Sequence, residues 1–336
     1  MSEPLLSVRD LQVDFHVGDR LARAVDGVSF DLFSGEVLAV VGESGCGKSV
    51  TALSVMRLVP QPPGRVSGEV GFEGRDLLRI PEREMERVRG GRIAMVFQDP
   101  LSSLNPVMTI GYQVAEAIAL HQKVPMKLAW ERAIEMLGRV GLPDPEVRAH
   151  SYPHQVSGGQ RQRVMIAMAF ACNPEVVIAD EPTTALDVTV QRQVLDLMLE
   201  LRRERGTSIL LITHDLGVVA ETADRVQVMY AGKVVETGTV FEIFDDPQHP
   251  YTRALLASVP RLEGDRLERL PAISGQPPDL LSLPPGCPFQ PRCPLAHDRC
   301  VEMPGWTAFS PTHRARCWAA EEGNGRGDGE IEGRRD

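Results

Sequence analysis

A glycine-rich loop between a buried strand and a helix constrains the fold of this chain more than any other feature. Residues 36–41, EVLAVV, form an almost wholly apolar run, which is typical of a strand buried on both faces. Residues 42–49, GESGCGKS, follow at once, and a helix is predicted from Ser49 to about Leu58, ahead of Pro60. A strand, a glycine-rich turn and a helix in this order indicate a phosphate-binding loop in an α/β protein.

The composition of this loop favours the binding of nucleotide phosphates. Its glycines allow backbone N–H groups to surround the phosphates, Lys48 can reach the β- and γ-phosphates, and Ser49 can ligate Mg²⁺. Cys46 is interpreted as a replacement for a small residue and not as a redox centre. The predicted nucleotide-binding positions in this stretch are Gly42, Glu43, Ser44, Gly45, Cys46, Gly47, Lys48, Ser49 and Val50.

A second candidate anion site lies more than 100 residues downstream and has a different design. Ser157, Gly158, Gly159 and Gln160 open an apolar helical segment that runs through residues 164–170. Such a turn exposes backbone N–H groups and the positive end of a helix dipole, which together attract anions. Two phosphate sites of different design in one ATPase indicate that the nucleotide is held between two molecules.

Polar side chains end three of the predicted buried strands. The strand at residues 176–179 ends in Asp180, which is placed to hold Mg²⁺, and in Glu181, the candidate general base that activates water. Gln98 and His214 end two further strands, at the edge where open α/β sheets bind ligands. We expect Gln98 to contact Mg²⁺ and the attacking water, and His214 to contact the γ-phosphate. Phe15 is either an adenine-stacking aromatic or a core residue.

Predicted strands alternate with helical patterns along most of the chain. This order implies an α/β fold with a parallel sheet, into which residues 99–160 are inserted as a helical segment. The predicted strands lie at residues 5–40, in short pieces across 60–98 that include 93–97, at 176–179, at 208–212 and in a hairpin at 225–240; a further helix is expected at 190–205.

The charge and hydropathy of the chain exclude several functions. The net charge of −10 argues against a nucleic-acid binder that works by bulk electrostatics. The sequence contains no apolar run of the roughly 18–20 residues that a membrane-spanning helix needs. The first residues, MSEP, lack the basic and apolar regions of a signal peptide, and we therefore expect a cytosolic location.

Together these motifs resemble the nucleotide-binding subunit of ABC transporters over about residues 5–245. The resemblance covers, in family order, the Walker A loop at 42–49, the Q-loop Gln98, the signature at 157–160, the Walker B pair, the D-loop at 185–187 and the switch residue His214. It implies a P-loop NTPase (RecA-like) core with an antiparallel β subdomain and a helical subdomain at about 99–160, all within a domain spanning 1–246.

The resemblance also implies how such a subunit works. ATP and Mg²⁺ bind the Walker A loop of one subunit, and the signature helix of a second ATPase subunit closes over the γ-phosphate. The expected partners are that second subunit, either a copy or a paralogue, two transmembrane permease subunits and, indirectly, an extracytoplasmic substrate-binding protein. The expected location is the cytoplasmic face of the membrane, as a peripheral subunit.

The C-terminal part narrows the resemblance to one branch of the family. The stretches HPYTRALL, at residues 249–256, and GCPFQPRCP, at residues 286–294, are similar to the extension of oligopeptide and dipeptide permease ATPases. This implies import of di- or oligopeptides, although some relatives carry nickel or glutathione. We expect an extension over residues 247–320, followed by a disordered tail at 321–336 that is rich in glycine and charge.

Four of the six cysteines cluster in this extension. In a reducing cytosol such a cluster favours metal binding over disulfides. No pair shows the short spacing of structural zinc sites, and loosely spaced thiolates suit an iron–sulfur cluster, which relatives in this branch hold. Zinc and free thiols remain alternatives. The candidate ligands of one [4Fe–4S] cluster are Cys287, Cys293, Cys300 and Cys317.

Two other functions compete with transport. ABC-type ATPases of DNA repair or translation usually carry a long coiled coil, a zinc insertion or two cassettes, and this sequence has one cassette and no heptad stretch. A purely regulatory ATP-binding module would be expected to lack Glu181 or His214, and both are present.

Overall fold

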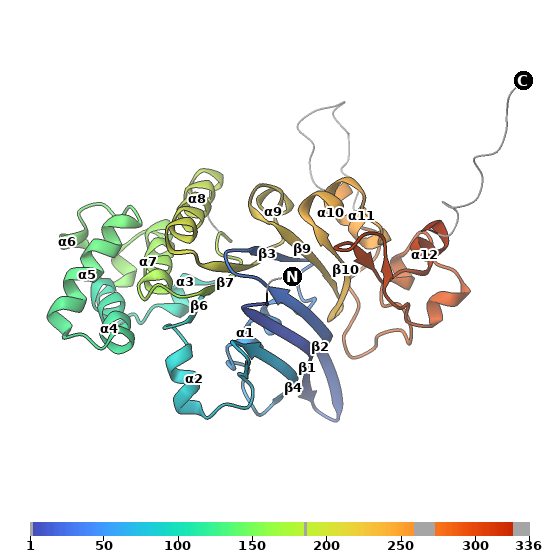
Figure 1. Ribbon diagram of the computed structural model, residues 1–336, viewed down its shortest axis with the longest axis horizontal. Coiled ribbons are helices and arrows are strands. Elements are labelled where there is room, and N and C mark those ends of the chain that lie inside the picture. Colours follow the sequence, from blue (N-terminus) through green and yellow to red (C-terminus); the bar gives the residue numbers. More distant parts are fainter. Residues whose placement is uncertain (1–2, 185–186, 259–272, 325–336) are drawn as a thin grey trace, which may run out of the picture.

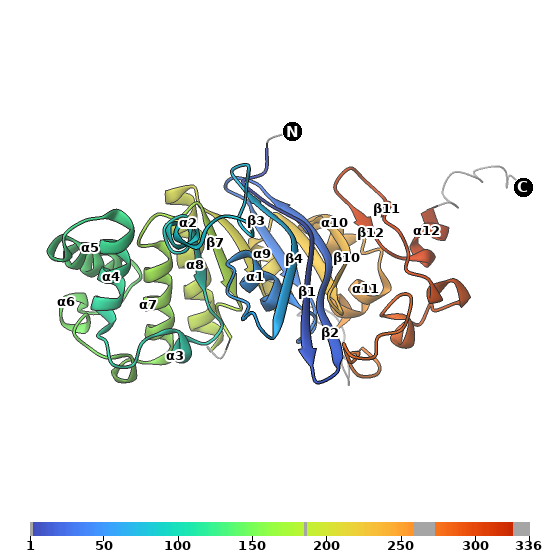
Figure 2. The same ribbon diagram turned by 90° about the horizontal axis from the view of Figure 1, so that it is seen from below.

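Two β-sheets pack against each other and carry helices at both ends of the molecule. The computed structural model describes residues 3–184, 187–258 and 273–324. The helical subdomain lies at one end, the C-terminal extension lies at the other, and the sheets lie between them (Figures 1 and 2). No helix within the described ranges combines the length and the apolar character needed to traverse a lipid bilayer.

The larger sheet supports the strand ends at which the predicted site residues lie. Its order is β11-β12-β10-β9-β3-β8-β7-β6, and its central strands are parallel. Every residue of β3, β7 and β8 is buried, which explains their continuous apolar sequences. The parallel strands are β6 (Ile93–Val96), β7 (Val176–Asp180), β8 (Ser208–Ile212), β3 (Val37–Val41) and β9 (Arg225–Tyr230).

The smaller sheet is antiparallel, as the resemblance implied, and shares a core with the larger one. Strand β1 (Leu6–Val17) pairs with β2 (Arg20–Leu32) and β4 (Gly64–Phe72), and the short β5 (Arg75–Asp76) follows β4. Helix α1 (Lys48–Val55) packs against both sheets. It ends three residues before the predicted end at Leu58.

A helix that the sequence did not predict interrupts the strands of residues 60–98. Helix α2 (Glu82–Val88) follows Pro81 and has Glu82 and Glu84 in its first turn. Both carboxylates suit the positive end of a helix dipole. Only Met85 of this helix is buried, and it therefore shows no apolar repeat from which a helix could be predicted.

The helical subdomain shares its hydrophobic core with the larger sheet. Helix α7 contacts α3, α4, α5, α8 and β6, and apolar residues of α4, α5, α7, α8 and β6 belong to one cluster. The helices of this part are α3 (Pro100–Ser103), α4 (Ile110–Gln122), α5 (Met126–Arg139), α6 (Pro145–Arg148), the 3-10 turn Pro153–Gln155 and α7 (Gly158–Phe170); α8 (Val188–Arg205) and α9 (Leu216–Thr222) follow the next strands.

The C-terminal extension continues the larger sheet. Strand β12 (Arg314–Ala315) pairs with β10 (Lys233–Thr239) and with β11 (Thr307–Ala308). Between these strands lie α10 (Val240–Asp245), α11 (Pro250–Ala257) and the 3-10 turns Gln290–Arg292 and Asp298–Val301. The last helix, α12 (Trp318–Asn324), begins three residues before the predicted start of the tail and includes residues 321–324 of it, whereas residues 325–336 lie outside the described part.

The indole N–H of Trp318 explains why α12 is ordered. It donates to the Glu302 carbonyl at 3.0 Å, and the Arg299 guanidinium lies 4.1 Å from the centre of the indole ring. Residues 321–324 of the predicted tail are therefore held in a helix that begins at Trp318, and the rest of that prediction falls on residues outside the described part.

Candidate nucleotide-binding site

The predicted phosphate loop joins β3 to α1 and has a backbone that glycine makes possible. Gly42 has φ 150° and Gly47 has φ 103°. A Cβ atom on Gly42 would lie 2.2 Å from the Met229 carbonyl oxygen, and one on Gly47 would lie 2.3 Å from that of Ala24. Neither distance leaves room for a side chain. Glycine at these two positions therefore allows the loop to lie this close to both sheets.

Lys48 is buried and turned toward the loop itself. Its ammonium donates to the carbonyl oxygens of Gly42, at 2.7 Å, and Glu43, at 2.9 Å. The Cys46 sulfur lies 3.8 Å from the same nitrogen, and burial raises the pKa of its thiol. A protonated, buried thiol is unreactive, which supports the interpretation of Cys46 as a small packing residue.

Ser49 and Asp180 meet, although 131 positions separate them in the sequence. The Ser49 hydroxyl donates to Asp180 Oδ1 at 2.9 Å, and Asp180 is 5% exposed. Burial raises the pKa of the Asp180 carboxyl, and the neighbouring Glu181 carboxylate raises it further against the Ser49 hydrogen bond. A buried carboxylate next to a hydroxyl fits Mg²⁺, since both groups supply oxygen ligands and the ion would compensate the charge.

Gln98 and His214 both reach the carboxylate of Glu181. The Gln98 amide donates to Oε2 at 2.9 Å, and His214 Nδ1 lies 3.3 Å from Oε1. The Thr184 hydroxyl also donates to Oε2, at 2.8 Å. Glu181 has φ 46°, a conformation that costs free energy in a residue other than glycine and that occurs often at functional sites. Sequence reasoning missed Thr184, whose only signal was its position three residues after the carboxylate.

The predicted signature forms the start of α7. The Ser157 hydroxyl accepts the Gln160 N–H at 3.3 Å, and the Gln160 side chain accepts the Ser157 N–H at 3.1 Å. The sequence predicted bare N–H groups here, but this reciprocal cap satisfies two of them. In the described part of the chain, no hydrogen bond or ion pair joins Ser157, Gly158, Gly159 or Gln160 to the phosphate loop.

The two glycines of the signature differ in their surroundings. A Cβ on Gly159 would lie 2.9 Å from Val190 Cγ1, whereas a Cβ on Gly158 would meet nothing within 4 Å. Packing inside this chain therefore does not require the glycine at 158. Of the predicted D-loop, Asp187 caps α8 by accepting the Val190 N–H at 3.0 Å, while Ala185 and Leu186 lie outside the described residues.

Of the remaining predicted binding residues, Ser44 and Gly45 are exposed, whereas Phe15 and Val50 are partly buried. Phe15 packs against the core between the two sheets, where its ring faces Gly64, and Val50 contacts the same core from α1. These contacts are compatible with both interpretations of Phe15. Its role in adenine stacking therefore stays a prediction.

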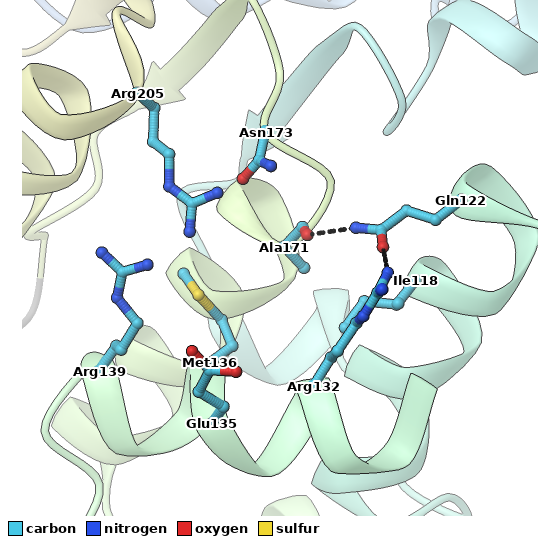
Figure 3. A pocket seen from close by; sticks show the side chains of 9 residues that line it. All are labelled: Ile118, Gln122, Arg132, Glu135, Met136, Arg139, Ala171, Asn173 and Arg205. Carbon is cyan, nitrogen blue, oxygen red and sulfur yellow. Dashed lines mark hydrogen bonds between the residues drawn. The ribbon is translucent and has the colours of Figure 1, made fainter. Parts of the chain in front are cut away.

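The cavity shown in Figure 3 is separate from these residues. It has a volume of about 340 Å³ and lies between α4, α5 and the C-terminal ends of α7 and α8. Arg132, Arg139 and Arg205 line it, but none of the predicted site residues does. The segment after α7 borders this cavity, about 20 Å along the helix from the signature.

The four late cysteines line one small, partly open cavity of about 10 Å³ together with His249, Phe289 and Trp318. Burial raises the pKa of Cys287 to about 11, with smaller contributions from the other three cysteines, and burial also raises the pKa of Cys293 and Cys317. Nevertheless, across the described ranges no group of three or more His, Cys, Asp or Glu side chains is arranged to hold a metal ion.

This arrangement supports neither a zinc ion nor the predicted iron–sulfur cluster. The four cysteines line the same cavity, but they do not form a preassembled metal site.

A phosphate loop, a buried serine–aspartate pair and a glutamate contacted by a glutamine and a histidine lie on one α/β sheet that carries a helical subdomain. These features define an ATP-binding cassette ATPase. Comparison with known proteins supports this class. Residues 25–184 match the family model of the ABC transporter, and residues 235–300 match that of the oligopeptide/dipeptide transporter C-terminal region.

Curated relatives match nearly the whole chain. A probable peptide ABC transporter ATP-binding protein, y4tR, of Sinorhizobium fredii is 54% identical, over 95% of this chain and 96% of the relative. The dipeptide transport ATP-binding protein DppD of Bacillus subtilis is 52% identical over the same shares. A solved dimer of the ATP-binding cassette MJ0796, bound to ADP and phosphate, has a TM-score of 0.63 and 27% identity, over 70% of this chain and 98% of that one.

The chain therefore belongs to the ABC transporter ATP-binding proteins, in the oligopeptide/dipeptide branch that the sequence predicted. Proteins of this family are ATPases coupled to transport, and the predicted enzyme class is confirmed.

Proposed function

We propose that this chain hydrolyses ATP to drive the import of di- or oligopeptides through a membrane transporter. The support is the match of its C-terminal region and the peptide-transport names of its relatives. In this proposal it lies at the cytoplasmic face of the membrane with a second ATPase subunit and two permease subunits, and an extracytoplasmic substrate-binding protein delivers the peptide to them. Nickel or glutathione import is the alternative. A deletion strain that still imports labelled dipeptides at the normal rate would contradict peptide import.

Two chains share each nucleotide in this proposal. The signature makes no polar contact with the phosphate loop of its own chain, and the space beside Gly158 is open. The related cassette MJ0796 was solved as a dimer with ADP and phosphate. We therefore assign the start of α7 to the nucleotide bound by the facing subunit, and ATP favours the closed pair only through its additional contacts there.

The described side chains supply the groups that hydrolysis needs. Lys48 and the loop N–H groups bind the β- and γ-phosphates, and Ser49 and Asp180 would hold Mg²⁺, which would neutralise charge on the phosphates. Glu181 takes the proton of the water that attacks the γ-phosphorus, and the bond to the β-phosphate oxygen breaks to release ADP and phosphate. His214 contacts the γ-phosphate as it is transferred.

The convergence of Gln98 and His214 on Glu181, beside the Ser49–Asp180 pair, is the observation that carries this mechanism. We expect Glu181→Gln to abolish steady-state hydrolysis, because an amide of the same shape cannot accept the proton. ATP binding should persist, and a stable dimer should accumulate. Phosphate release and size-exclusion chromatography in ATP measure the two effects.

A matched control is available on α8. Glu200 is exposed there, and Glu200→Gln should hydrolyse ATP at the normal rate. Near-normal turnover by the Glu181→Gln variant would remove Glu181 from the role of general base.

We also infer that Cys287, Cys293, Cys300 and Cys317 ligate a [4Fe–4S] cluster. The support is their shared cavity and the wide spacing of these cysteines in the sequence. When bound, the cluster would cross-link the three segments of the extension that carry the cysteines. Protein purified without oxygen should contain iron and show visible thiolate-to-iron absorbance, and Cys300→Ser should lose both. Colourless protein without iron would rule the cluster out.

A further inference from the structure

Arg292, in the C-terminal extension, forms a partly buried ion pair with the phosphate loop. Its guanidinium donates to both carboxylate oxygens of Glu43, at 2.6 and 3.0 Å, across 249 positions of sequence. The Arg292 side chain is 5% exposed and that of Glu43 is 22% exposed. This two-bond geometry is the strongest form of an arginine–carboxylate contact, and it also fixes orientation.

All five N–H groups of Arg292 have acceptors. The remaining bonds reach the Tyr230 hydroxyl at 3.2 Å, the Ser274 carbonyl at 2.8 Å and the Ile273 carbonyl at 3.4 Å. Tyr230 also packs its ring against those of Tyr251 and Phe289. Arg292 is therefore held rigidly by the extension and by the core, and it can pass a displacement of either one to Glu43.

Glu43 is in turn tied to the lysine of the phosphate loop. Its N–H donates to the Tyr251 hydroxyl at 2.8 Å, and its carbonyl accepts the Lys48 ammonium at 2.9 Å. The extension thus holds this residue by its backbone through Tyr251 and by its side chain through Arg292. A shift of Glu43 changes the position from which Lys48 must reach a phosphate.

We propose that Arg292 couples the four-cysteine cavity to the phosphate loop, as a positioning residue for ATP binding. Arg292 directly precedes Cys293, which lines that cavity. Rearrangement of the cavity therefore moves the partner of Glu43, and nucleotide binding acts back on the cavity to the same extent, because coupling between two sites is reciprocal. This inference rests on the proposed nucleotide site at residues 42–49.

The alternative is that Arg292 only fastens the extension to the core. A fastening residue would change thermal stability when it is replaced and leave the affinity of the folded protein unchanged. Nucleotide affinity, measured where every variant is folded, separates the two roles.

The first experiment measures the affinity for a fluorescent ATP analogue with Mg²⁺, at a temperature where circular dichroism shows the full chain folded. We expect Arg292→Ala to weaken binding by about five- to a hundredfold, the usual range of coupling between sites. The affinity of Arg292→Lys should lie between those of the unaltered chain and the alanine variant, because lysine keeps the charge but loses the two-bond geometry. If the alanine variant fails to fold, the lysine variant carries the test.

Arg314→Ala provides the matched control. Arg314 lies in the same extension, is exposed and stacks on the Trp306 ring at 4.6 Å, and within the described residues it bonds neither to the phosphate loop nor to the lining of the four-cysteine cavity. Its replacement should leave the affinity within about twofold. Folded Arg292 variants that bind the analogue as tightly as this control would overturn the proposal.

The second experiment measures the effect of nucleotide binding on the segment that contains Cys287 and Cys293. Hydrogen–deuterium exchange of residues 287–293, followed with and without the ATP analogue, should slow in the unaltered chain when nucleotide binds. In Arg292→Lys this response should shrink. A segment that exchanges identically with and without nucleotide in the unaltered chain would contradict reciprocal coupling.

Lys48→Ala separates this proposal from the one on which it rests. If this variant keeps normal affinity for the analogue, the proposed nucleotide site itself is wrong. If it loses binding while the Arg292 variants do not, only the coupling fails.

Discussion

At the scale of single residues, a substitution of Gly158 should reduce ATP hydrolysis without reducing the stability of the fold. Among the described residues, a methyl group at this position meets nothing within 4 Å, and alanine favours helix over glycine by up to about 1 kcal/mol. We expect Gly158→Ala to keep or raise the melting temperature. Hydrolysis should nevertheless fall by tenfold or more, because a displacement of about 1 Å at a reacting centre can cost about a hundredfold in rate.

Calorimetry and a phosphate-release assay on the same sample make this comparison. Gly305→Ala is the control, since it also adds a methyl group where nothing lies within 4 Å, but in the extension. A Gly158→Ala protein with unchanged hydrolysis would argue against a close approach by the facing subunit. Gly159→Asp is a poorer test, because a side chain there meets Val190 of the same chain.

The sequence predicted the site residues that belong to local motifs, and it missed contacts made across the fold. Asp180 and Glu181 follow a buried strand, and their meeting with Ser49 and Gln98 follows from parallel strands ending at one edge. No local pattern links Arg292 to Glu43, because their pairing depends on how the extension docks. The cap of Gln160 on Ser157 was readable from their three-residue spacing but was not recognised.

At the scale of elements, burial and periodicity explain where the prediction worked. The strand at residues 208–212 matches β8, since all its residues are apolar or buried in the sheet. Helix α2 was missed because it buries a single residue. The extent of α12 was missed because it depends on Trp318 contacts that lie outside its own pattern.

The N-cap of α11 leads to a prediction about how the stability of the protein depends on pH. His249 caps the helix by accepting the Tyr251 N–H at 3.0 Å, and burial lowers its pKa to about 4. In the unfolded chain this histidine takes up a proton below about pH 6.5. Between about pH 4 and about pH 6.5 the unfolded state therefore binds more protons than the folded state. The free energy of unfolding should fall by on the order of 3 kcal/mol as the pH drops through this range.

Urea unfolding at about pH 7.5 and about pH 5 measures this loss. His249→Asn keeps a capping acceptor but cannot titrate, and it should show a smaller difference between the two pH values. His16→Asn, on an exposed part of β1, should behave as the unaltered chain does. An equal pH dependence in all three proteins would exclude His249 as its source.

At the scale of the whole molecule, the extension completes the core. Strand β12 pairs with β10, and Tyr251 and Phe289 of the extension are buried in the same cluster as Tyr230. A chain ending at residue 246 should therefore melt at a lower temperature, because it loses several kcal/mol of stabilising apolar burial. It should also aggregate and scatter more light as its concentration rises, because the edge of β10 is left unpaired.

Thermal unfolding and light scattering test this expectation. A chain ending at Asn324 retains the described contacts and serves as the reference. If the chain that ends at residue 246 stays monomeric with an unchanged melting temperature, the extension is an independent appendage.

The pairing of β12 with β10 also bears on how the protein is made. Synthesis proceeds from the N-terminus, and domains begin to fold as they emerge from the ribosome. The residues of β10 emerge well before Arg314 and Ala315, their partners in β12. The nascent chain therefore presents an open strand edge until residues 314 and 315 have emerged, and during this interval a chaperone would find that edge accessible.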